Sequence, residues 1–231
     1  MAQSNAASPA DKKQTALPTA QIHPELTHKG EIVVLIHGLM RTSLSMRPLK
    51  SFLEAQGYQV YFYSYPSAKY TIHEHAVYLN QFVQNLLAKN AGVKIYFITH
   101  SLGGIIIREA LAKLSPSQLK NVGGLVMLAP PNQGSLLAKI STKILPITAS
   151  LIKPLAELSS DQNSYVHHVP VPNIKIGIIA GRFDAKVPPS SARLKGRSEL
   201  MIVNTTHTFI MNSSTTRKLI MNFLKKGTFT G

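Results

Sequence analysis

The stretch "VKIYFITHSLGGIIIREALAKL", residues 93–114, places a lone hydroxyl between a strand-like and a helix-like segment. The apolar run over residues 93–99 is typical of a strand buried on both faces, and residues 102–114 predict a helix that begins directly after it. So abrupt a turn strains the backbone and admits only small neighbours, which the two glycines after Leu102 provide. We therefore expect Ser101 to lie exposed at an edge of a sheet, above a helix N-terminus that stabilises negative charge.

The same alternation of short apolar runs and helical patterns continues on both sides of this stretch. Helical spacing of apolar residues predicts helices over residues 46–56, 71–89 and 214–226. Further strand-like runs are "EIVVLIHG" (31–38), "GYQVYFYSY" (57–65), "VGGLVMLAP" (122–130), "NIKIGIIAG" (173–181) and "ELMIVNT" (199–205). The pattern predicts a three-layer α/β fold, with about six mostly parallel strands between two layers of helices.

Composition limits the class of protein. The chain has 231 residues, 44% of them hydrophobic and 15% charged, which suits one globular domain, and no apolar run reaches the roughly 18 residues of a membrane span. The absence of cysteine excludes a thiolate metal site and a cysteine nucleophile. No secretory signal is visible, so we expect a soluble protein and leave open whether it is cytoplasmic or exported.

The net charge of +15 favours anionic partners. The basic residues are scattered without an arginine-rich run, so we expect no nucleic-acid binding and rank an anionic membrane or ligand first. One basic loop carries Arg182, Lys186, Arg193, Lys195 and Arg197. A solvated loop is favoured there over a positive rim that attracts anionic lipid or substrate.

The chain divides into a flexible tail over residues 1–22 and one domain over residues 23–231. Residues of about 131–172 break the strand–helix alternation, and their apolar spacing predicts one or two short helices, a small cap inserted over the carboxyl edge of the sheet. A cap in this position is either a lid or acyl-chain wall, or ordinary packing on the core. In the first case the residues expected to contact the substrate are Leu136, Leu137 and Ile140.

The five residues Thr99-His100-Ser101-Leu102-Gly103 resemble the nucleophile elbow of the α/β-hydrolase family, Gly-x-Ser-x-Gly, with Thr99 in place of the first glycine. The resemblance implies that Ser101 is a nucleophile at a slightly reshaped turn. The family's chain order then requires an acid and a histidine further along. Asp184 in "AGRFDAKVP" and His207 in "LMIVNTTHTFIMNS" each follow a predicted strand and match that order.

The segment "VLIHGLM", residues 34–40, resembles the oxyanion loop of lipases. By that resemblance, the backbone N–H groups of Leu39 and Leu102 hold the oxyanion. His37 is then expected to brace this loop. His73 and His75 are expected on a solvated helix face, because their spacing of two residues separates the rings too far for one metal ion.

Together these features resemble compact bacterial lipases and esterases of the α/β-hydrolase family. The implied function is hydrolysis of carboxylic esters through a Ser-His-Asp triad and an acyl-enzyme, with no cofactor or metal. Thioester or amide hydrolysis, or acyl transfer, on the same triad stays open, as does a catalytically inactive, membrane-associating binding protein. We expect an acyl ester or lipid as substrate and peripheral contact with an anionic membrane; the oligomeric state stays open.

Overall fold

The computed structural model describes residues 30–135, 152–194, 196 and 198–230. Within them the chain forms a six-stranded sheet in the order β2-β1-β3-β4-β5-β6, and every neighbouring pair is parallel. The strands are β1 (Ile32–Ile36), β2 (Gln59–Tyr63), β3 (Ile95–His100), β4 (Val122–Leu128), β5 (Ile176–Gly181) and β6 (Ser198–Val203). The predicted α/β sheet is confirmed, and it is wholly rather than mostly parallel.

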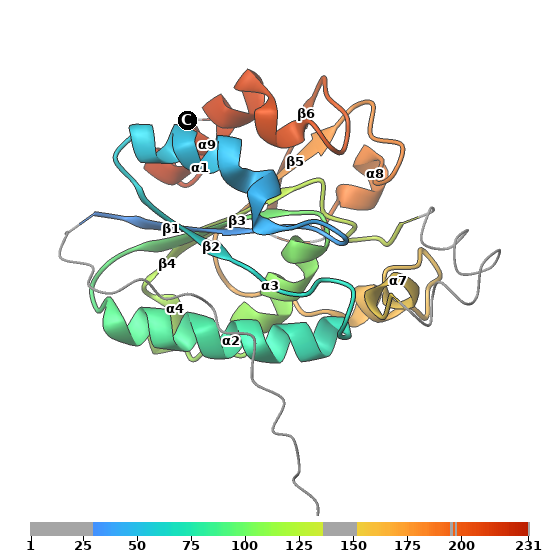
Figure 1. Ribbon diagram of the computed structural model, residues 1–231, viewed down its shortest axis with the longest axis horizontal. Coiled ribbons are helices and arrows are strands. Elements are labelled where there is room, and N and C mark those ends of the chain that lie inside the picture. Colours follow the sequence, from blue (N-terminus) through green and yellow to red (C-terminus); the bar gives the residue numbers. More distant parts are fainter. Residues whose placement is uncertain (1–29, 136–151, 195, 197, 231) are drawn as a thin grey trace, which may run out of the picture.

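Helices cover both faces of the sheet, as the predicted three layers require (Figure 1). The lower layer in this view holds α2 (Ile72–Lys89), α3 (Leu102–Ala112) and α4 (Pro116–Leu119); the upper layer holds α1 (Arg47–Ala55) and α9 (Ser214–Lys226). Short elements complete the described chain: η1 (Ser43–Met46), α7 (Pro154–Glu157), η2 (Tyr165–His168), α8 (Pro189–Ala192) and η3 (Ile210–Asn212).

The continuous apolar strands follow from burial on both faces. In β1, Ile32, Val34 and Ile36 pack in the core on the side of α2 and α3. Val33 and Leu35 point the other way, toward the core that α1 and α9 close. Each face thus needs apolar residues at alternate positions, and the two sets together give an uninterrupted apolar run.

Helix ends lie close to their predicted bounds because capping groups fix them. Thr71 and Glu74 form a capping box at the start of α2, in which the Glu74 N–H donates to the Thr71 hydroxyl at 3.1 Å and the Thr71 N–H donates to the Glu74 carboxylate at 2.7 Å. At the other end of the chain, α9 stops at Gly227, whose φ of 76° is left-handed.

The prediction of a solvated position is wrong for His75. His75 is only 1% exposed and meets the rings of Tyr65 and Tyr70 edge-on, with centroids 4.9 and 5.6 Å away. It lies three residues after Ile72 and four before Leu79, and so belongs to the buried stripe of α2. His73 points away from this stripe and, 55% exposed, contacts Glu109 at 2.6 Å.

Several predictions fall on residues outside the described ranges. They are the flexible tail over residues 1–22 and the three proposed substrate contacts, Leu136, Leu137 and Ile140. The described part of the predicted insertion contains η2 and α7, the latter on the right of Figure 1. An isolated parallel bridge joins Ser135 to Ser159 at its base.

Candidate active site

Ser101 occupies the turn between β3 and α3. Its backbone has φ 51° and ψ −121°, a conformation that side-chain-bearing residues rarely adopt. The turn is held on both sides, since the Ser101 N–H donates to the Leu128 carbonyl at 2.9 Å and the Ser101 carbonyl accepts from the Gly104 N–H at 3.0 Å. Strain of this kind costs about 1–3 kcal/mol and persists only where the surroundings fix it, most often at functional sites.

Close backbone packing explains the glycines around this turn. A Cβ on Gly103 would lie 2.7 Å from the His37 carbonyl oxygen, so the β1 loop could not approach the start of α3 if that residue had a side chain. A Cβ on Gly38 would lie 3.0 Å from the Ser101 Cβ. Thr99 is fully buried within β3, at the position where the elbow pattern has its first glycine, and Ser101 keeps its left-handed φ.

The structure joins Asp184 to His207 by a hydrogen bond. Asp184 follows β5 and His207 follows β6, and His207 Nδ1 lies 2.7 Å from Asp184 Oδ2. Because the carboxylate can only accept, Nδ1 carries the proton and Nε2 keeps the lone pair of the neutral ring. The other carboxylate oxygen accepts the N–H groups of Lys186 at 2.9 Å and Val187 at 2.7 Å, which fix the orientation of Asp184.

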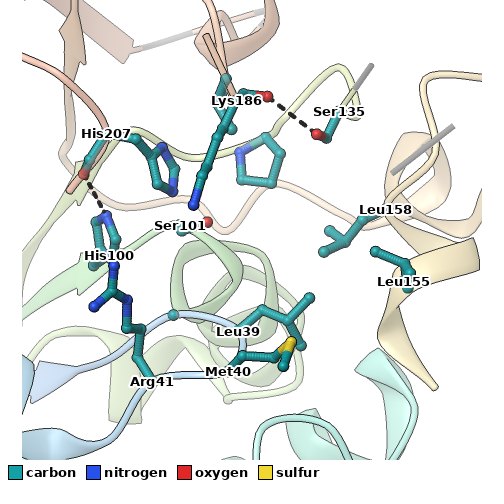
Figure 2. Close-up of a pocket in the computed structure, with 13 residues that line it drawn as sticks. Leu39, Met40, Arg41, His100, Ser101, Ser135, Leu155, Leu158, Lys186 and His207 are labelled. Atoms are coloured by element: carbon teal, nitrogen blue, oxygen red, sulfur yellow. Dashed lines mark hydrogen bonds between the residues drawn. The ribbon is translucent and has the colours of Figure 1, made fainter. Parts of the chain in front are cut away.

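Ser101 and His207 line one cavity of about 400 Å³, within the roughly 300–1,000 Å³ of small-molecule sites. Among the described residues the Ser101 hydroxyl makes no hydrogen bond. Figure 2 shows the ring of His207 facing the cavity from the loop after β6. Leu155 and Leu158 lie on the opposite side, so the cavity has an apolar side and a polar side.

The loop after β1 brings the backbone of Leu39 to the same cavity. Leu102 is the first residue of α3, so its N–H has no partner within the helix. No hydrogen bond among the described residues uses the N–H of Leu39 or of Leu102. Within the described part of the chain both N–H groups are therefore without a hydrogen-bond partner.

Two polar residues after β2 hold this loop and were missed by sequence reasoning. The Tyr65 hydroxyl donates to the His37 carbonyl at 2.8 Å, and the Met40 N–H donates to the Ser67 hydroxyl at 2.9 Å. The His37 ring stacks on Tyr65 with centroids 4.3 Å apart. His37 thus contributes to the bracing of the loop, as expected, but through Tyr65. Tyr65 is the last residue of the predicted strand over residues 57–65 and Ser67 lies two residues later, and no pattern in the sequence marks either of them.

His100 packs beside the elbow. Its Nε2 donates to the carbonyl of His207 at 3.0 Å, and the two rings lie 4.7 Å apart between centroids. Burial lowers the pKa of His100 to about 3, and the nearby His207 and Arg41 act in the same direction. His100 is therefore neutral at ordinary pH and positions His207 through its main chain.

Arg108 is a further structural residue that the sequence pattern did not reveal. It is 3% exposed on α3 and donates to Asn132 Oδ1 at 2.8 Å and to the carbonyl of Val169. Asn132 in turn donates to the Ala192 carbonyl at 2.8 Å. Burial lowers the pKa of Arg108 to about 10, which leaves it charged. This network ties α3 to the segments that carry Pro131 and Ser135, two lining residues of the cavity.

The described residues contain no group of three or more histidine, cysteine or acidic side chains placed to hold a metal ion. Nor does any helix among them have the length and apolar character needed to cross a membrane.

A sheet of parallel strands with helices on both faces, carrying these residues at the carboxyl ends of β3, β5 and β6, defines the α/β-hydrolase fold. Residues 27–139, just under half of the chain, match the model of a protein family described as "Putative serine esterase (DUF676)". Among curated proteins, no sequence matches this one.

Solved structures of lipases and esterases share the fold. The mature lipase BlEst2 of Bacillus licheniformis superposes with a TM-score of 0.70 at 19% identity, over 87% of this chain and 94% of that one. Lipase B of Aspergillus fumigatus gives 0.71 at 17% identity, over 85% of this chain and 52% of that one. The metagenomic carboxyl esterase MGS0156 gives 0.66 at 20% identity, over 84% and 69%. With the family match, these similarities support an ester hydrolase.

Proposed function

We propose that the protein is a serine hydrolase of carboxylic esters, with Ser101 as nucleophile, His207 as general base and Asp184 as the residue that orients the base. The observation that carries this proposal is the 2.7 Å hydrogen bond from His207 to buried Asp184, on a cavity that His207 shares with the strained Ser101 turn. The proposed nucleophile, base and acid thus come from the segments that follow three different strands.

The reaction follows from this geometry. His207 Nε2 takes the proton of Ser101, and the serine oxygen attacks the ester carbonyl. The N–H groups of Leu39 and Leu102 stabilise the oxyanion, and Asp184 stabilises the imidazolium. His207 then donates its proton to the leaving alcohol, and water hydrolyses the acyl-enzyme by the reverse sequence. These residues require no cofactor or metal ion for the reaction.

The apolar side of the cavity suits the acyl chain. Four apolar side chains line the cavity: Leu39, Leu155, Leu158 and Val187. We propose that these side chains contact the acyl group, together with Leu136, Leu137 and Ile140, which lie outside the described residues.

Hydrolysis of 4-nitrophenyl butyrate by variants tests the proposal. Ser101→Ala and His207→Ala should each lower kcat by about 10⁴-fold or more, and the double variant should be little worse, because the residues act as a unit. Asp184→Asn should retain somewhat more activity. Ser117→Ala and His168→Ala, at exposed positions away from the cavity, serve as controls and should keep the wild-type rate. Wild-type turnover by Ser101→Ala would exclude the assigned nucleophile.

A substrate panel separates the other reactions of the same triad. Butyryl esters, thioesters and amides, each offered with and without an acceptor alcohol, should show the ester as the best substrate and water as the acyl acceptor. A faster thioester or amide, or dominant transfer to the alcohol, would assign the alternative activity. No turnover of any of them would favour the inactive binding protein.

We also propose peripheral contact with an anionic membrane. The observation is a set of exposed apolar side chains on the loops after β1, β5 and β6, here called the apolar rim: Met40, Leu44, Phe183 and Phe209, between 62% and 69% exposed. These loops touch, since the Arg41 guanidinium donates to the Thr208 hydroxyl at 3.3 Å and the Phe183 N–H to the Thr205 carbonyl at 3.0 Å. Exposed apolar area beside cations suits an anionic lipid surface.

Co-sedimentation with phosphatidylglycerol and phosphatidylcholine vesicles tests this contact. We expect binding to the anionic vesicles at low salt, weaker binding at high salt, and further loss in Phe209→Ser. Val77→Ser removes an apolar side chain that is 46% exposed on α2, away from the rim, and should bind as wild type does. No binding to phosphatidylglycerol at low salt would refute the contact.

A further inference from the structure

The cavity lining carries two permanent positive charges and no carboxylate. Arg41 and Lys186 are both exposed lining residues, and in the described part of the chain neither forms an ion pair. The Asp184 carboxylate accepts hydrogen bonds from the His207 ring and from two backbone N–H groups, and it does not line the cavity. The sequence from Leu136 to Leu151 contains two lysines and no acidic residue, so it supplies no carboxylate that could neutralise the two cations.

The charges lie on the side of the cavity from which the leaving group departs. Figure 2 shows Arg41 pointing toward His100, across the cavity from Leu155 and Leu158, and Lys186 reaching into the cavity from above. The Arg41 guanidinium donates to Thr208, the residue next to His207. Since His207 must protonate the departing alkoxide, the alcohol half of an ester lies on this side. The acyl half then lies toward the leucines.

We propose that the enzyme selects esters whose alcohol half carries an anionic group, a carboxylate or a phosphate, which Arg41 and Lys186 bind. The inference rests on the proposed function and names the substrate class of that site. A guanidinium can hold both oxygens of such a group, and an ammonium adds a point charge. Because both side chains are exposed, each contributes about as much as one surface ion pair, up to roughly fivefold in kcat/KM.

Two esters that differ by a single anion test the proposal: butyrylglycerol phosphate and butyrylglycerol, each with the butyryl group on a terminal hydroxyl. The value of kcat/KM is measured for both, and the value for the phosphate is divided by the value for the neutral ester. We expect a ratio of about ten or more at low salt, which falls as salt screens the charges. Arg41→Gln and Lys186→Gln should each lower the ratio about fivefold or less, and together return it close to one. A ratio near one in the wild type overturns the proposal.

Arg182→Gln is the matched control, since it removes the same charge from an exposed position after β5 that does not line the cavity. It should keep the wild-type ratio. If Arg182→Gln lowered the ratio as much as the two cavity variants do, the preference would come from the net charge of the protein and the two-residue site would be refuted.

Two further substrates test which half of the ester carries the bound anion, and whether the preference for the anion comes from a soluble ester or from a lipid surface. 4-Nitrophenyl hydrogen succinate carries its carboxylate on the acyl half, so it should be no better than neutral 4-nitrophenyl butyrate; a clear preference for it would contradict the assigned side. Oleoylglycerol phosphate aggregates, whereas the butyryl ester is monomeric. The neutral partner of oleoylglycerol phosphate is oleoylglycerol. If butyrylglycerol phosphate is preferred over butyrylglycerol, the cavity itself recognises the anion of a soluble ester. If only oleoylglycerol phosphate is preferred over oleoylglycerol, the preference comes from the charged lipid surface, and the cavity site is overturned.

The failure of this inference is distinguishable from that of the proposed function. Hydrolysis of butyrylglycerol that requires Ser101, without preference for the phosphate, would leave the serine hydrolase intact and remove only the anion site. Hydrolysis that persists in Ser101→Ala would remove both.

Discussion

Replacing His75 by glutamine should flatten the pH dependence of stability. His75 is buried beside Tyr65 and Tyr70, and desolvation lowers its pKa from 6.5 to about 4. Below about pH 6.5 the His75 ring is protonated in the unfolded chain, whereas in the native state it is protonated only below about pH 4. The free energy of unfolding therefore falls as the pH falls from about 6.5 to about 4. Between pH 7 and 5 the loss from this one group is about 2 kcal/mol.

Urea unfolding followed by circular dichroism at pH 7 and pH 5 measures this loss. The glutamine variant also loses ring packing, but that cost is the same at both pH values and cancels in the difference. We expect the wild type to lose about 2 kcal/mol more than His75→Gln between pH 7 and 5. His168→Gln, at an exposed position, should behave as wild type does. Equal losses in the wild type and His75→Gln would refute the assignment of His75 as a neutral buried ring.

Three other substitutions test how the site is positioned. Gly103→Ala should destabilise the fold by about 1–3 kcal/mol and abolish most ester hydrolysis, because its Cβ would lie 2.7 Å from the His37 carbonyl; wild-type melting and activity would contradict this packing. Tyr65→Phe leaves that carbonyl unbonded and should lower kcat more than it changes KM; an effect on KM alone would argue against a role in holding the Leu39 loop. Arg108→Met should cost about 2–4 kcal/mol in urea unfolding, since Asn132 loses a buried donor, and a neutral effect would contradict the network.

The sheet was predictable because a parallel strand buried on both faces must be apolar at every position. The six strands lie where the apolar runs predict them, although the run over residues 93–99 becomes a strand over Ile95–His100 and the run over 173–181 begins as a strand only at Ile176. Apolar residues continue beyond the residues whose backbone pairs with a neighbouring strand. The ends of a strand are therefore set by backbone pairing and cannot be read from the apolar run alone.

The part of the candidate site that depends on the order of residues along the chain could be predicted from the sequence. Asp184 and His207 were expected to meet because the resemblance to the α/β-hydrolase family gives the order serine, acid, histidine, and each of the two follows a predicted strand. Tyr65 was not given a place in the site, because its contact depends on which strands are neighbours: it reaches the His37 carbonyl only because β2 lies beside β1. His75 was placed in solvent because ring spacing was considered without the apolar stripe on either side of it.

Labelling with a fluorophosphonate tests the nucleophile most directly. Such a reagent reacts with a serine that an adjacent base activates, and mass spectrometry reads both the number of adducts and the residue that carries them. The account predicts one adduct per chain, on the peptide that contains Ser101, with none in Ser101→Ala and strongly slowed labelling in His207→Ala. An adduct on a different serine, or ester hydrolysis by a chain in which Ser101 never reacts, would contradict it.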